Sequence, residues 1–106
     1  MKEFKKYHMY IMTNKSNKVL YTGFSGDLAN RCHKHKIKFY KGFTAKYNVD
    51  KLVYYETFDT PSLAIAREKQ VKGYSKKKKE ALINKANPNW KDLYDNGVIE
   101  KIDSPK

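Results

Sequence analysis

The chain has 106 residues, of which 40% are apolar, and this is enough material for one domain with a modest core. Its 23 lysines and arginines exceed its 11 acidic residues, and the formal charge of +12 favours a polyanion, above all nucleic acid, as partner. The single cysteine, Cys32, excludes a disulfide framework and a cysteine-rich zinc finger.

The first part of the chain predicts a β-hairpin followed by a helix. Residues 7–13 and 19–24 are rich in apolar and aromatic side chains, and the Asn and Ser residues within 14–18 favour a turn between two strands. Residues 25–27 are then typical of a helix start. The acidic Asp27 lies at the N-terminal end, where the helix dipole favours a negative charge. We expect this helix to cover residues 28–39.

The middle of the chain predicts a loop, a third strand and a second helix. Residues 40–50 are basic and aromatic, which is typical of an exposed loop, and residues 51–58 form the strand. Thr60 and Pro61 fit the N-cap and the first position of a helix. Gly73 is expected to end that helix as a left-handed C-cap.

The last part of the chain predicts one more helix and a tail. Ser75 caps a helix to about Ala86, residues 87–94 form a short turn or helix, and residues 95–106 are a polar, flexible tail. The order β-β-α-β-α-α predicts an α+β fold, in which helices flank a small three-stranded antiparallel sheet. Residues 1–94 then form a single domain.

The N-terminal segment and the hydropathy pattern bear on localisation. The first twelve residues lack the apolar core of a signal peptide, and no apolar run approaches the roughly 20 residues of a membrane span. We expect a cytoplasmic protein that does not enter the membrane.

Four side chains of the hairpin and the first helix draw attention. Tyr10 and Tyr21 lie on the paired strands, roughly opposite each other, although strand tyrosines usually serve packing. Arg31 and His35 lie four residues apart, beside the apolar stripe of the first helix. Arginine can bind a phosphate with two parallel hydrogen bonds, so Arg31 and His35 together indicate an anion-binding site. The alternatives are a snorkelling arginine and a capped or exposed histidine.

Glu68 is the strongest single anomaly of the sequence. It lies one helical turn after Ala64 and three residues before Val71, so its carboxylate falls on the apolar face of the second helix. A buried carboxylate costs several kcal/mol unless it is paired or binds a metal. A functional carboxylate is one interpretation, and a structural ion pair with Arg31 or a nearby lysine is the other.

Together these groups match the needs of phosphodiester hydrolysis. The reaction requires a cation at the scissile phosphate, a base for the attacking water and a divalent ion near the developing charge. A lone carboxylate favours one Mg²⁺-type ion that waters and phosphate oxygens complete. Spacing alone leaves this assembly undetermined.

The paired motifs His8-Met9-Tyr10 and Tyr21-Thr22-Gly23 resemble those of the GIY-YIG nuclease superfamily. The resemblance extends over residues 6–94, and it is closest to the small stand-alone bacterial members. Three further segments carry it: GFTAKYNVDKLVYYE at 42–56, AREKQVKGYSKKKKEALI at 66–83 and NPNWKDL at 87–93. His8, Met9 and Thr22 depart from the family pattern without removing a catalytic atom.

The resemblance implies a role for each matching residue. Tyr10 is then the favoured general base, Tyr21 the second motif tyrosine, and Gly23 lies beside the phosphate. Arg31 would stabilise the pentavalent phosphate, and His35 would assist proton transfer to or from a tyrosine. Glu68 would hold the divalent metal, Mg²⁺ or Mn²⁺. A late asparagine that orients the site is Asn87, with Asn84 as the alternative.

Basic and aromatic residues outside this set are candidates for contacts with nucleic acid. The lysines predicted to bind it are Lys34, Lys41, Lys46, Lys76 and Lys77. Tyr40, Phe43 and Tyr47 are interleaved with lysines, so they can stack on bases or fix the loop to the core. The run of lysines at 76–79 surrounds a full helical turn, which is more typical of a solvated face.

Three functions compete at this stage. The first is a metal-dependent endonuclease that hydrolyses DNA, with DNA repair or recombination as its setting. The second is a non-catalytic module that binds nucleic acid on the same fold. The third, weaker one is a basic protein associated with RNA or the ribosome. The complete set of tyrosines, arginine, histidine and carboxylate favours the nuclease.

Overall fold

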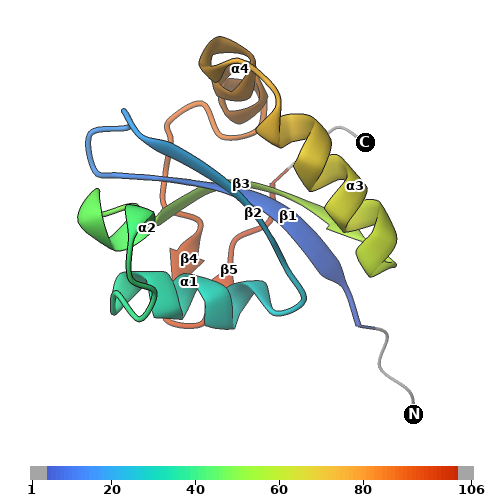
Figure 1. The fold of residues 1–106 in the computed structure, drawn as a ribbon, viewed down its shortest axis with the longest axis horizontal. Helices are drawn as coiled ribbons and strands as arrows, with labels where there is room; N and C mark the ends of the chain where they lie inside the picture. Colours follow the sequence, from blue (N-terminus) through green and yellow to red (C-terminus); the bar gives the residue numbers. More distant parts are fainter. Residues whose placement is uncertain (1–4, 103–106) are drawn as a thin grey trace.

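A three-stranded antiparallel sheet forms the centre of the protein in a computed structural model, which describes residues 5–102 (Figure 1). Its strands are β1 (Tyr7–Thr13), β2 (Leu20–Ser25) and β3 (Lys51–Phe58), in the order β2-β1-β3. The predicted sheet is therefore confirmed, with β1 in the middle and β2 at an edge. The predicted bounds hold for β1 and β3, and β2 is shifted by one residue.

The register of the hairpin differs from the expected one. Tyr10 pairs with Gly23, and Tyr21 pairs with Met12, so the two tyrosines are diagonal neighbours on one face instead of direct partners. The turn fixes this register, because the Asn14 side chain accepts hydrogen bonds from the backbone of Lys18 and Val19. As a consequence, the ring of Tyr10 lies opposite Gly23, which has no side chain.

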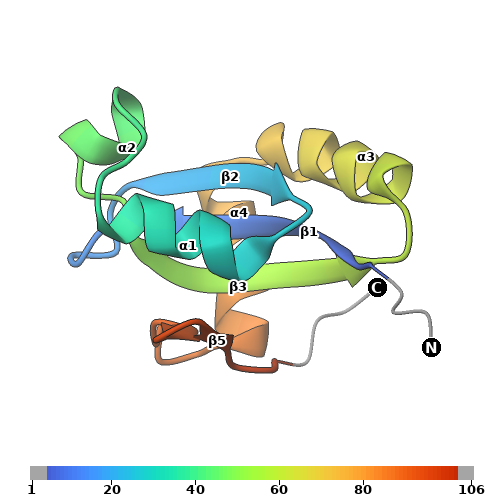
Figure 2. The same ribbon diagram turned by 90° about the horizontal axis from the view of Figure 1, so that it is seen from below.

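The helices cover both faces of the sheet (Figures 1 and 2). On one face lies α1 (Leu28–Lys36), and on the other lie α3 (Pro61–Lys72) and α4 (Lys76–Ala86). Side-chain oxygens of Asp27, Thr60 and Ser75 cap the three helices, as the sequence predicts. Between α1 and β3, the predicted loop contains the single turn α2 (Phe43–Lys46).

Two helix ends differ from the prediction. The first helix stops at Lys36, about one turn before Phe39, because Ile37 forms its C-cap and Lys38 adopts a positive φ of 56°. Gly73 has a right-handed conformation with φ −81°, not the expected left-handed one. The C-cap of α3 therefore keeps a right-handed helical conformation, and this position does not need the conformational freedom of glycine.

Part of the predicted flexible tail is ordered. Residues 94–99 form a second hairpin, β4 (Tyr94–Asp95) and β5 (Val98–Ile99), whose turn residues Asn96 and Gly97 have positive φ. Such an Asn-Gly pair is the preferred sequence for a two-residue hairpin turn. Ile99 and Ile102 pack against the core, which explains why this segment folds back. The remainder of the predicted tail lies outside the described residues.

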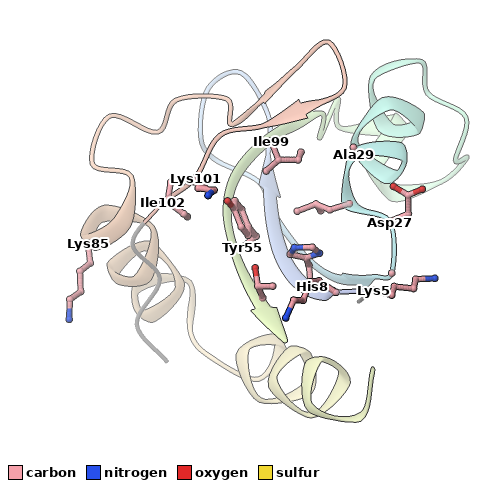
Figure 3. A pocket seen from close by; sticks show the side chains of 13 residues that line it. Lys5, His8, Asp27, Ala29, Tyr55, Lys85, Ile99, Lys101 and Ile102 are labelled. Atoms are coloured by element: carbon pink, nitrogen blue, oxygen red, sulfur yellow. The ribbon is translucent and has the colours of Figure 1, made fainter. Parts of the chain in front are cut away.

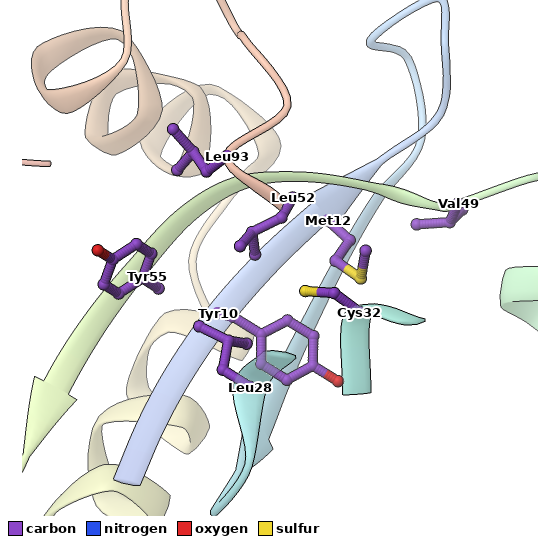
Figure 4. Close-up of a cluster of buried hydrophobic side chains, with 8 residues drawn as sticks. All are labelled: Tyr10, Met12, Leu28, Cys32, Val49, Leu52, Tyr55 and Leu93. Carbon is purple, nitrogen blue, oxygen red and sulfur yellow. The ribbon is translucent and has the colours of Figure 1, made fainter. Parts of the chain in front are cut away.

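The core consists of two clusters, one on each face of the sheet. The α1-side cluster, shown in Figure 4, comprises Tyr10, Met12, Leu28, Cys32, Val49, Leu52, Tyr55 and Leu93. The α3-side cluster comprises Met9, Ile11, Val53, Tyr54, Val71 and Ile83. Among the described residues, no helix is long and apolar enough to cross a membrane.

Candidate active site

Four aromatic rings and one guanidinium converge where α1 meets β1 and β2. We call Tyr10, Tyr21, Arg31, His35 and Tyr40 the tyrosine–histidine cluster. The ring centre of His35 lies 6.3 Å from that of Tyr10, 5.9 Å from that of Tyr21 and 4.9 Å from that of Tyr40. The Arg31 guanidinium lies 5.3 Å from the ring centre of Tyr40. The structure thus brings together four of the residues that the sequence singled out.

Tyr40 is the member of this cluster that the sequence analysis did not place beside the motif tyrosines. It lies beyond the end of α1, where no helical or strand periodicity determines the direction of its side chain. Its ring covers His35 and provides an aromatic face for Arg31, a favourable contact for a cation. Of the two predicted roles for Tyr40, the structure favours packing over base stacking.

Gly23 makes room for the Tyr10 ring. A Cβ atom at Gly23 would lie 2.6 Å from both the hydroxyl oxygen and Cζ of Tyr10, far inside van der Waals contact. The Tyr10 side chain is fully buried, so its ring has little freedom to move aside. The glycine of the second motif therefore positions a candidate catalytic phenol.

Replacing Gly23 with alanine is expected to displace the Tyr10 ring. We expect cleavage of DNA to fall by roughly 10–100-fold, because small misplacements of catalytic groups are costly. The free energy of unfolding should fall by about 1–3 kcal/mol from overpacking. Urea denaturation and a cleavage assay measure the two effects. Gly73→Ala is the control, because a Cβ atom there would meet its nearest neighbour at an ordinary 3.5 Å and φ is negative. Equal losses of activity and stability in both variants would contradict a specific role of Gly23 in positioning Tyr10.

Several polar atoms of the cluster are buried and have no hydrogen-bond partner in the part of the chain that the structure describes. They are the Tyr10 hydroxyl and both ring nitrogens of His35, a residue that is 6% exposed. Burial, and secondarily the Arg31 charge, lowers the pKa of His35 to about 4, so its imidazole is neutral at pH 7. Burial raises the pKa of Tyr10 well above its ordinary value, although Arg31 acts in the opposite direction. The cluster thus presents a neutral base beside a protonated phenol and a cation.

The lowered pKa of His35 predicts a loss of stability in acid. Above pH 6.5 the imidazole is neutral in both the folded and the unfolded chain, so its burial costs nothing extra. Between pH 6.5 and 4 the unfolded chain binds a proton that the folded chain does not, and the free energy of unfolding should fall by up to roughly 3 kcal/mol.

An NMR titration of His35 and urea denaturation at several pH values measure these quantities. His35→Gln should remove this part of the acid sensitivity, whereas His33→Gln, at an exposed position, should not. The charged groups that face His35 are Arg31, which lowers its pKa, and Asp50, which raises it. A His35 pKa near 6.5 would contradict this description of the cluster.

Glu68 lies on α3, the helix that packs along β1 and β2 from the other face. Ala64 and Val71 are fully buried, as the helical spacing predicts, and the Glu68 side chain is 12% exposed. Its carboxylate lies 3.2 Å from the Lys72 ammonium, which agrees with the predicted alternative of a pair with a nearby lysine. Glu68 thus belongs to a helix that covers the face of the sheet opposite α1 and that contacts the edge strand β2.

A buried carboxylate that the sequence analysis missed is Glu56 of β3. It is 1% exposed, and Arg67 binds it with two hydrogen bonds, from Nε at 2.9 Å and from Nη2 at 3.1 Å. The hydroxyl of Tyr54 donates to the same carboxylate. Because every strong partner of Glu56 comes from the protein, this pair is part of the framework of the α3 face.

The two candidate asparagines are engaged locally. Asn87 donates to the carbonyls of Val53 at 3.0 Å and Lys91 at 2.8 Å, so it ties the end of α4 to β3. Asn84 accepts a hydrogen bond of 2.6 Å from the Trp90 indole. In these positions both amides hold the fold together, and neither belongs to the tyrosine–histidine cluster.

The predicted nucleic-acid lysines occupy two separate surfaces. Lys34 lies in the last turn of α1, Lys41 precedes α2 and Lys46 ends it. Lys34 lies over the Phe39 ring at 4.8 Å and Lys46 over the Tyr47 ring at 5.4 Å. Of the loop aromatics named from the sequence, Phe43 is 50% exposed and Tyr47 42% exposed, so these two rings do not fix the loop to the core. Lys76 and Lys77 start α4, where Lys76 donates to the carbonyl of Lys18 at 2.6 Å.

A metal ion would need ligands from outside the protein. Within residues 5–102, no three His, Cys, Asp or Glu side chains lie close enough to hold a metal ion. Glu68 provides one carboxylate, and Mg²⁺ commonly combines one or two carboxylates with waters and substrate phosphates. The donor set therefore fits a metal shared between Glu68 and a phosphate, and it does not fit one held by protein side chains alone.

Comparisons with known proteins show the family of the chain. Residues 6–81 match the GIY-YIG catalytic domain. A UPF0213 protein of Haloquadratum walsbyi is 34% identical over 72% of this chain and 85% of its own length. A UPF0213 protein of Staphylococcus saprophyticus is 40% identical over 74% of this chain and 95% of its own.

The fold has a counterpart among solved structures. The solution structure of a UPF0213 protein from Bacillus halodurans aligns with a TM-score of 0.52 and 26% identity, covering 82% of this chain and 92% of that one. The sequence comparisons and the fold comparison therefore lead to the same family as the paired motifs on β1 and β2. This chain belongs to the GIY-YIG family, among the small UPF0213 proteins.

Proposed function

We propose that the protein is an endonuclease that hydrolyses phosphodiester bonds in DNA with the help of a divalent metal, Mg²⁺ or Mn²⁺. The observation that carries this proposal is the tyrosine–histidine cluster. There, the two motif tyrosines, Arg31 and His35 lie together. The Tyr10 hydroxyl and both imidazole nitrogens have no hydrogen-bond partner within residues 5–102. Buried polar atoms normally have partners, so unpartnered ones next to a cation indicate a place prepared for a polar substrate.

The charges of the cluster suit an attack on phosphate. Arg31 stabilises negative charge as it develops on the phosphate oxygens. Tyr10 is the general base in this proposal, and the neutral His35 takes the phenolic proton as the phenol removes a proton from the attacking water. Arg31 supports this step, because its charge lowers the pKa of the neighbouring phenol.

Glu68 reaches the same phosphate around the β2 edge. Among residues 5–102, no strand pairs with the outer side of β2, which has Tyr21 and Gly23 on one face and α3 against the other. A phosphate that straddles this edge would contact both sets of residues. When bound there, a divalent metal supplies charge neutralisation at the phosphate, and Glu68 is its protein ligand. Lys72 then exchanges its carboxylate partner for solvent or phosphate.

The positive charge supports binding to a polyanion, and the exposed lysines around α2 are the proposed contacts. The alternative function is a module that binds nucleic acid without cleaving it. It is supported by the Glu68–Lys72 pair, which gives this carboxylate a structural partner.

A cleavage assay on a substrate panel tests the proposed function. Labelled single-stranded, duplex and branched DNA, and single-stranded RNA, are incubated with Mg²⁺, Mn²⁺ or a chelator, and binding is measured in parallel. Cleavage of DNA that stops in the chelator is the expected result. Tight binding of DNA without cleavage under all conditions would support the alternative function. A preference for RNA would overturn DNA as the substrate of the nuclease and as the ligand of the binding module.

A further inference from the structure

A hollow of about 920 Å³ opens on the α1 face of the sheet, on the side of α1 that faces β3 (Figure 3). Its walls come from the starts of β1 and α1, the end of β3, one residue of α4, and β5 with the segment that follows it. It shares no residue with the tyrosine–histidine cluster. The function proposed above therefore leaves this hollow without a role.

The floor of the hollow is apolar and aromatic. Leu28 and Tyr55 belong to the α1-side cluster, and Ile99 and Ile102 pack against it. His8 stands edge-on to Tyr55, with ring centres 5.6 Å apart and an interplanar angle of 74°. Such a floor offers both a flat contact surface and ring edges to a planar ligand.

His8 adds a hydrogen-bonding group to this floor. Its Nδ1 atom is buried and has no partner among the described residues. Burial lowers the pKa of His8, so the imidazole is neutral and offers one donor and one acceptor nitrogen. A planar ligand on the floor can therefore bond to the protein through its polar edge.

The rim of the hollow is positively charged. Lys5, Lys85 and Lys101 line it, and Lys6 lines it while paired with Asp59. The acidic group of the rim is Asp27, whose carboxylate already accepts the Asn30 N–H as the N-cap of α1. The rim therefore favours an anionic group above a floor that favours a ring.

We propose that this hollow binds a nucleotide, with the base on the apolar floor against His8 and Tyr55 and the phosphate at the rim lysines. Its volume lies within the range of roughly 300–1,000 Å³ that is usual for small-ligand sites. The nucleotide can be a free nucleoside monophosphate or the terminal nucleotide of a nucleic-acid strand, since both have the same recognised parts.

An NMR titration of the ¹⁵N-labelled protein tests this inference. The probes are adenosine monophosphate, adenosine, inorganic phosphate and a 5′-phosphorylated oligonucleotide. We expect saturable shifts at the amides of Ala29, Thr57 and Ile99, with adenosine and phosphate each at least about tenfold weaker than the nucleotide. Saturation by the monophosphate identifies a free nucleotide as sufficient. Saturation by the oligonucleotide alone identifies a strand end. No saturable shift with either, or equal binding of phosphate alone, would overturn the proposal.

Two variants and one control distinguish specific binding in the hollow from non-specific attraction to positive charge. Lys5→Glu with Lys101→Glu should weaken binding about tenfold, and Ala29→Leu, which fills the hollow without a change of charge, should abolish the shift at Thr57. The control, Lys15→Glu with Lys69→Glu, changes the net charge equally at exposed positions outside the hollow. An equal loss in the control would refute a specific site.

The readout is independent of catalysis. It records binding at residues outside the tyrosine–histidine cluster, so it can succeed in a protein that does not cleave DNA and fail in one that does. The amide spectrum of each variant also shows whether that variant is folded. Failure of this inference is therefore distinguishable from failure of the proposed function.

Discussion

Replacing Arg31 with alanine is expected to lower the rate of DNA cleavage by about 10²–10³-fold, the usual effect of removing a group that stabilises charge in the transition state. Arg31 is the cation of the tyrosine–histidine cluster, where it neighbours Tyr10, His35 and Tyr40. Its loss removes both the charge that faces the phosphate and the charge that lowers the pKa of Tyr10. Initial cleavage rates at saturating DNA measure the effect.

Arg31→Lys is the matched variant, because it keeps the charge and loses the planar fork. We expect it to recover only a small part of the activity, since lysine cannot bind a phosphate with two parallel hydrogen bonds. Arg31→Ala should leave the thermal stability nearly unchanged, because the side chain is only partly buried. Full activity in Arg31→Ala would remove this residue from the mechanism.

Replacing Arg67 with methionine is expected to lower the free energy of unfolding by about 3–5 kcal/mol, because it leaves the Glu56 carboxylate buried without its counter-ion. Glu56 is 1% exposed, and Arg67 supplies two of its hydrogen bonds. Urea denaturation measures the loss. Neither Glu56 nor Arg67 belongs to the tyrosine–histidine cluster, so the main expected effect of this substitution is on stability.

The double variant Glu56→Leu with Arg67→Met tests the reason for this loss. An apolar pair of similar volume often replaces a buried ion pair without a net cost, so the double variant should be more stable than Arg67→Met alone. A loss below about 1 kcal/mol in the single variant would mean that solvent reaches the Glu56 carboxylate.

The sequence predicts the local structure well where signals are local. Thr60 and Ser75 mark helix starts through side chains that cap their own helices, and both are confirmed. Helical spacing alone predicts that Glu68 lies on the apolar face of its helix, and its side chain is only 12% exposed in the structure. The Asn96-Gly97 turn was a local signal too, but the polar composition of residues 95–106 obscured it, and the hairpin became apparent only in the fold.

Partners from distant segments could not be predicted in this way. Glu56 meets Arg67 only because α3 crosses over β3, and no spacing within one element shows that contact. The same holds for Tyr40, which joins the tyrosine–histidine cluster after the chain has left α1. The roles of the site residues, including Glu68 and Asn87, remain predictions of the family resemblance.

The most direct test of the central claim compares cleavage and binding in Glu68→Gln, which keeps the shape of the side chain and removes its charge. With Mg²⁺ present, we predict that cleavage of DNA falls to background while the affinity for DNA stays the same or rises slightly. This separation follows if Glu68 holds the metal and the lysines hold the strand. Unchanged cleavage in Glu68→Gln would contradict the account, and it would leave this carboxylate as the structural partner of Lys72.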